Sequence, residues 1–144
     1  MSASRLMTLP TTRSDLVRRI APLLAQLGGP STDAAVHSLT ELREALPLLL
    51  EEYHRESDAE RRRLLIHCIW QYRDPGVIPT LAAALDDAND RVWKESLDGL
   101  VTLGTGEALV ILENARQQSE ASGPDEKRQW IAEAIQQVRS GNNG

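Results

Sequence analysis

The stretch that decides the fold is residues 75–104, which read PGVIPTLAAALDDANDRVWKESLDGLVTLG. Its apolar residues recur every three or four positions, first in 77–85 and again in 92–103, as on the buried face of an α-helix. A polar turn at 86–90 separates the two runs, and Gly104 ends the second. The stretch therefore predicts two helices that pack through their apolar faces.

A short apolar pattern near the start of this helix pair recurs along the chain. It combines apolar residues with a central proline in three copies, and the fourth copy has valine instead. Recurrence of this kind is typical of stacked repeats, each too small to bury its apolar face alone. The last two intervals agree in length, whereas the first is shorter. The four copies are centred on Pro22, Pro47, Pro79 and Val110.

Residues 75–104 resemble the HEAT-like repeat of the phycobilisome-lyase type. The matching positions are Leu85-Asp86-Asp87, Asp90-Arg91-Val92, Ser96, Gly99-Leu100 and Leu103-Gly104. Trp93 stands where that family usually has arginine. The resemblance implies an all-α fold, a right-handed α-solenoid of about four helical hairpins whose second helices line a concave surface.

The remaining helical periodicity places one repeat domain over residues 15–139. We expect residues 1–14 to form a flexible arm and residues 140–144 a disordered tail. Pro47 must kink or interrupt the segment 31–56, which is either one bent helix or two helices. A loop is predicted at 119–125.

Charge and cysteine content limit the partners and the compartment. The chain has 21 acidic against 16 basic residues and a net charge of −5, which disfavours nucleic acid because such ligands are bound through clustered cations. Cys68 is the single cysteine, so no internal disulfide forms. No segment resembles a signal peptide or a membrane span, and we expect a cytoplasmic protein.

Residues capable of catalysis or metal binding are scattered. His37, His54 and His67 fall on three predicted helices without a metal-ligand spacing. Cys68 lies on an apolar stripe, where a small protonated thiol packs as core. We therefore expect no cofactor, no metal and no enzymatic activity.

Two clusters of charged residues can be explained without a ligand. The run Arg61-Arg62-Arg63 is either a solvated helix start or a recognition patch, and Ser57 to Glu60 has the spacing of a capping box. Asp86, Asp87 and Asp90 lack the ligand spacing of a calcium loop, so helix capping and solvation explain them.

Exposed aromatic residues are the best indication of a binding surface, because they supply contact area at low entropy cost. On a helical wheel Trp70 falls opposite the apolar stripe of its helix. Trp93 and Trp130 lie near the edges of their buried faces, where each either reaches a partner or packs between repeats. The predicted partner-binding residues are Arg63, Ile66, His67, Trp70, Trp93, Lys94, Asp98 and Trp130.

Three functions are compatible with these observations. The first is a protein-binding module, either an adaptor or an immunity-type inhibitor of a basic partner such as a toxin. The second is a nucleic-acid enzyme resembling the HEAT-like alkylpurine glycosylases, which the acidic charge disfavours. The third is a subunit resembling the chromophore lyases, for which no matching motif is found. We favour the first, as an inference from resemblance.

Overall fold

The structure, a computed structural model, describes residues 12–122 and 125–142. In these ranges it contains α-helices and two short 3-10 turns, and no strand. The elements are α2 (Arg13–Gln26), α3 (Thr32–Glu41), η1 (Arg43–Ala45), α4 (Leu46–Arg55), α5 (Ala59–Gln71), η2 (Pro75–Val77), α6 (Ile78–Ala84), α7 (Asp90–Leu103), α8 (Gly106–Ser122) and α9 (Asp125–Asn142).

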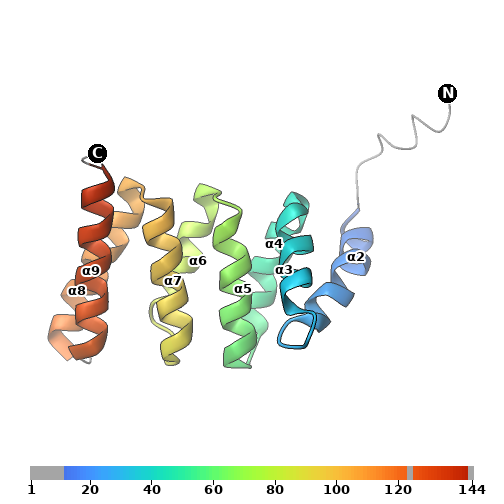
Figure 1. Cartoon of the computed structure of the whole chain (residues 1–144), viewed down its shortest axis with the longest axis horizontal. Helices are drawn as coiled ribbons and strands as arrows, with labels where there is room; N and C mark the ends of the chain where they lie inside the picture. Colours follow the sequence, from blue (N-terminus) through green and yellow to red (C-terminus); the bar gives the residue numbers. More distant parts are fainter. Residues whose placement is uncertain (1–11, 123–124, 143–144) are drawn as a thin grey trace.

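The helices form a row of hairpins arranged in two layers (Figure 1). The second helices of the hairpins, α5, α7 and α9, stand side by side in front, and the first helices, α4, α6 and α8, lie behind them. α2 and α9 lie at opposite ends of the row. The predicted all-α solenoid of four hairpins is confirmed over the described residues.

The helices at the two ends of the row extend a few residues beyond 15–139. Most of the predicted arm and the last two residues of the predicted tail lie outside the described residues. Within them, α2 already begins at Arg13, where the Thr12 hydroxyl caps it by accepting from the backbone N–H of Asp15 at 3.1 Å. At the other end α9 continues to Asn142, and α8 runs to Ser122 through the first part of the predicted loop.

The segment 31–56 forms two helices and not one bent helix. The turn η1 connects α3 to α4, and Pro47 lies in the first turn of α4. Proline is tolerated there because the first N–H groups of a helix have no intrahelical acceptor. Pro79 has the same place in α6, whereas Pro22 lies inside α2 on its exposed side.

Local caps define the ends of the second helices. The Asp58 carboxylate, and not Ser57 as the capping box predicted, accepts from the backbone N–H of Arg61 at 2.9 Å. Asn89 caps α7 in the same way, at 2.9 Å. Gly104 ends α7 in the left-handed region, with φ of 60°, which glycine adopts without strain.

α5 and α7 form the most extensive helix-to-helix contact of the described chain. On α7, Gly99 allows this approach because it lies directly against Trp70 of α5, whereas the buried Ser96 faces α6, where its hydroxyl donates to the carbonyl of Leu81 at 2.5 Å. A Cβ atom placed on Gly99 would lie 2.7 Å from the Cβ atom of Trp70. The close contact therefore depends on the absence of a side chain at this position.

Cys68 is fully buried in the core, as predicted. Burial, with a smaller contribution from the charge of Glu95, raises the pKa of its thiol to about 12. The thiolate is the reactive form, so the native protein has almost none of it at neutral pH.

Native Cys68 is therefore expected to resist alkylation by a maleimide at neutral pH and to react once urea has unfolded the chain. The measurement is the mass increase with time. A Gln129→Cys variant supplies an internal control, because Gln129 is exposed and its thiol should react rapidly while Cys68 does not. Equal rates at the two sites would contradict the burial of Cys68.

Candidate functional site

The arginine run at the start of α5 links neighbouring repeats, which neither sequence-based interpretation included. Arg61 donates to the backbone carbonyl of Leu27 at 3.0 Å and so connects α5 to the first hairpin. Arg62 makes a two-pronged ion pair with Asp87, at 2.8 and 3.1 Å, in the turn before α7. Planar guanidinium groups suit such paired contacts with a carboxylate. These two arginines thus hold the repeats together.

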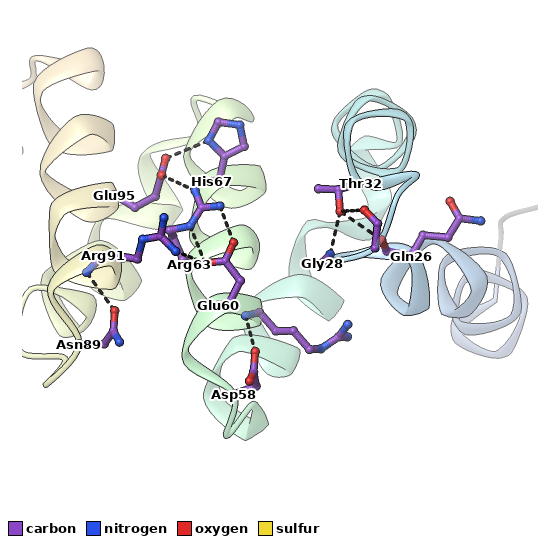
Figure 2. A network of polar contacts seen from close by, with 12 residues as sticks. Gln26, Gly28, Thr32, Asp58, Glu60, Arg63, His67, Asn89, Arg91 and Glu95 are labelled. Carbon is purple, nitrogen blue, oxygen red and sulfur yellow. Dashed lines mark hydrogen bonds and ion pairs between the residues drawn. The ribbon is translucent and has the colours of Figure 1, made fainter.

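Arg63, the third arginine, belongs to a network between α5 and α7 whose centre is Glu95 (Figure 2). One carboxylate oxygen of Glu95 accepts from the indole Nε1 of Trp70 at 2.9 Å and lies 2.9 Å from Nδ1 of His67. The other lies 3.4 Å from the guanidinium of Arg63. The side chain of Glu95 is only 10% exposed, so one nearly buried carboxylate orients three side chains of the neighbouring helix.

The protonation of Glu95 reflects this environment. Burial raises the pKa of its carboxyl group, but hydrogen bonds from His67 and Trp70 and the charges of His67 and Arg63 lower it more. The net result is a pKa below the ordinary value, which keeps Glu95 ionised at neutral pH.

A second carboxylate, Glu60, extends the network along the start of α5. It accepts from Arg63 at 2.8 Å and from Arg91 of α7 at 3.4 Å. Neither Glu60 nor Glu95 was predicted from the sequence as a network residue. The only signal for Glu95 was its place directly before the small residue Ser96, because the side chains of α5 that lie opposite it are set by helix packing.

Two of the predicted partner-binding residues are buried. Ile66 is 0% exposed and Trp93 is 4% exposed, so neither offers a surface for contact. The prediction for Ile66 was wrong because α5 packs against α3, α4 and α7. Neighbours on several sides bury more of the helix surface than the single apolar stripe of the helical wheel. Trp93 follows the alternative interpretation and packs between repeats.

The other six predicted residues lie at least partly at the surface of α5, α7 and α9. They are Arg63, His67, Trp70, Lys94, Asp98 and Trp130. Trp70 is half-buried, since its ring packs on Gly99 and its Nε1 bonds to Glu95.

An aromatic cluster joins α7 to α9. Trp130 is 39% exposed and its ring meets that of Trp93 edge to face, with centroids 6.3 Å apart. The ammonium of Lys94 lies 4.7 Å from the centroid of Trp130 and pairs with Glu126 at 3.0 Å. Attraction between a cation and the ring face stabilises such contacts by about 0.5–1 kcal/mol at exposed sites.

Asp98 lies on the exposed side of α7, one turn after Glu95. Burial and the charge of Glu95 raise the pKa of its carboxyl group, and His67 offsets this only in part. Its carboxylate forms no ion pair with any described residue. Asp98 is thus an exposed carboxylate without an ion-pair partner among the described residues, and the charge of His67 compensates it only in part.

The opposite layer has a surface feature of a different kind. An open apolar groove of about 660 Å³ lies between α6 and α8, and Val110 at its edge is 55% exposed. Its lining includes Ile78, Pro79 and Ile111. This groove has few polar groups and therefore little to specify an orientation for a ligand.

The described residues include no helix with the length and apolar content needed to cross a membrane.

Stacked helical hairpins with one continuous core and a charged, aromatic outer face define a helical repeat protein. A family model for HEAT repeats matches residues 46–136, the larger part of the chain. The chain belongs to the HEAT repeat family. A comparison with curated proteins finds no match.

Proposed function

We propose that this HEAT repeat chain is a non-catalytic module that binds another protein through the exposed face of α5, α7 and α9, the helices expected to line the concave surface. This face is here called the second-helix face. The observation that supports this most is the network around Glu95. It holds Arg63, His67 and Trp70 in fixed orientations while leaving each of them partly exposed. Side chains ordered before binding lose little entropy on binding, which favours affinity.

The exposed residues on this face suit a protein partner. Trp130, with Lys94 and Asp98 beside it, combines an aromatic anchor with charges of both signs. Aromatic residues bordered by polar groups are typical of binding hot spots. The net charge of −5 favours a basic partner, which suits an inhibitor of a basic toxin as well as an adaptor for a basic protein.

Nucleic acid is the alternative ligand of this face, and the use of its arginines argues against it. Arg61, Arg62 and Arg63 each pair with a carboxylate of the chain. Cations paired in this way are not free to neutralise phosphates, which supply most of the affinity for nucleic acid.

The test is affinity capture with the full chain, followed by reconstitution of the complex from purified components. A Lys94→Glu/Trp130→Ala variant alters the second-helix face, and a matched Glu107→Lys/Val110→Ser variant alters exposed residues of the opposite layer. We expect one stoichiometric protein partner whose dissociation constant rises at least about tenfold, or about 1.4 kcal/mol, only in the first variant.

Loss of the partner only in the Glu107→Lys/Val110→Ser variant would move the binding site to the groove between α6 and α8 and contradict the proposal. Affinity for DNA that falls steeply with salt concentration, with no protein partner, would support the nucleic-acid alternative.

A further inference from the structure

A small notch between α7 and α9 lies on the second-helix face. Its volume is about 60 Å³, roughly the space of two water molecules, so it accommodates one small head group and no aromatic ring system. Its lining is apolar at the helix contact and polar at the rim. The residues that form it are Leu97, Asp98, Val101, Trp130, Glu133, Ala134 and Gln137.

The rim has two carboxylates without an ion-pair partner among the described residues. Asp98 and Glu133, on opposite sides of the notch, are both exposed, and neither forms an ion pair within the described part of the chain. By contrast, the nearby carboxylates Glu95 and Glu126 have cationic partners, Arg63 and Lys94. Burial beside Glu95 also raises the pKa of Asp98, as expected for a carboxylate whose surroundings disfavour its charge.

Trp130 supplies the third component, an exposed aromatic ring at the same rim. The ring already attracts one cation, since Lys94 lies 4.7 Å from its centroid one helical turn before Asp98. Trp130 as a whole remains 39% exposed, so it can contact an incoming group. An exposed aromatic ring that lines the same notch as two unpaired carboxylates complements a planar cation.

We propose that this notch receives an arginine or lysine side chain of the partner protein, which stacks on Trp130 and pairs with Asp98 and Glu133. The assignment rests on the proposed protein-binding function and specifies the chemistry of the contact. Arginine fits better than lysine, because a guanidinium can stack on a ring and bond to carboxylates at its edge at the same time.

The test uses two blocked tripeptides as probes, Gly-Arg-Gly and the neutral Gly-Gln-Gly, at constant ionic strength. Proton–nitrogen correlation spectra separate the indole signals of the three tryptophans, and a Trp130→Phe variant assigns the signal of Trp130. The arginine peptide is expected to shift the Trp130 signal saturably, with little change at Trp70. The glutamine peptide should cause no saturable shift.

Neutralising the rim provides the decisive variant. In Asp98→Asn/Glu133→Gln the dissociation constant for the arginine peptide should rise at least about tenfold. Both positions are exposed, so circular dichroism and the urea midpoint should confirm that the variant is folded. Unchanged binding in this variant, or equal shifts with Mg²⁺ in place of the peptide, would overturn the proposal.

The two proposals can fail separately. If binding of a captured partner depends on Lys94 and Trp130 but is normal in Asp98→Asn/Glu133→Gln, the proposed binding through the second-helix face is supported and the proposed arginine site is contradicted. If the arginine peptide binds but no protein partner loses affinity when this face is altered, the proposed function is contradicted instead.

Discussion

A Gly99→Val substitution is expected to lower the free energy of unfolding by about 3 kcal/mol, the upper end for overpacking in a core. Three atoms of Trp70, its Cβ, Cγ and Cδ1, lie within 2.9 Å of the position that a Cβ on Gly99 would occupy. The Cβ of Trp70 is fixed to the backbone of α5, so α5 and α7 must separate. Urea denaturation followed by far-UV circular dichroism measures the loss.

Gly106→Val is the matched control, because nothing lies within 4 Å of a Cβ atom there. Its effect should stay within about 0.5 kcal/mol. In a Trp70→Ala background, Gly99→Val should be less destabilising, since two of the three crowded atoms are gone. Fully additive effects of the two substitutions would show that the indole ring of Trp70 does not contribute to the strain.

Glu95→Gln is expected to destabilise the protein by about 2 kcal/mol at neutral pH. The amide still accepts a hydrogen bond from Trp70, but the charged contacts with Arg63 and His67 are lost. Those two side chains are 26% and 37% exposed, so water compensates part of the loss. The measurement is the urea midpoint, together with the indole signal of Trp70, which should shift.

The contacts of Glu95 also predict how the stability of the protein changes with pH. The pKa of Glu95 is lower in the folded state than its ordinary value of 4.5. The carboxylate therefore contributes its full stabilisation above about pH 5, and that contribution is lost as the pH falls through the folded-state pKa. The stability difference between wild type and Glu95→Gln should shrink over this acidic window.

Asp98→Asn provides a control of opposite sign. The pKa of Asp98 is raised in the folded state above its ordinary value of 3.8, so its ionised form opposes folding at neutral pH. Asp98→Asn should leave stability unchanged or raise it slightly, and this gain should vanish as the pH falls below the ordinary pKa. Equal destabilisation by Glu95→Gln and Asp98→Asn would show that Glu95 has no special role.

The candidate site was predictable only in outline. Asp98 was predicted only as a member of the partner-binding set, and the structure places it on the exposed side of α7. Helical periodicity placed Ile66 at the surface, but a helix in the middle of a row is covered on more than one side, and a single-helix wheel does not contain that information. Glu95 was not selected at all, because its importance depends on which side chains of α5 lie opposite it.

The roles of the arginines of α5 could not be predicted from local sequence either. Three adjacent cations are ordinary on a solvated helix start, and nothing in their spacing distinguishes Arg62 from its neighbours. Its role depends on Asp87, which follows 25 positions later and meets it only after α6 folds back. Partners this distant along the chain are set by hairpin stacking and not by local pattern.

The sequence by itself determined the helices, the end of α7 at Gly104, and the stacking of four hairpins, because these follow from periodicity and local hydrogen bonds. Tertiary structure alone decided which charges pair across repeats, how closely α7 approaches Trp70, and which carboxylates remain without a cation. Those outcomes depend on distances between helices, and such distances arise only when the apolar faces have packed.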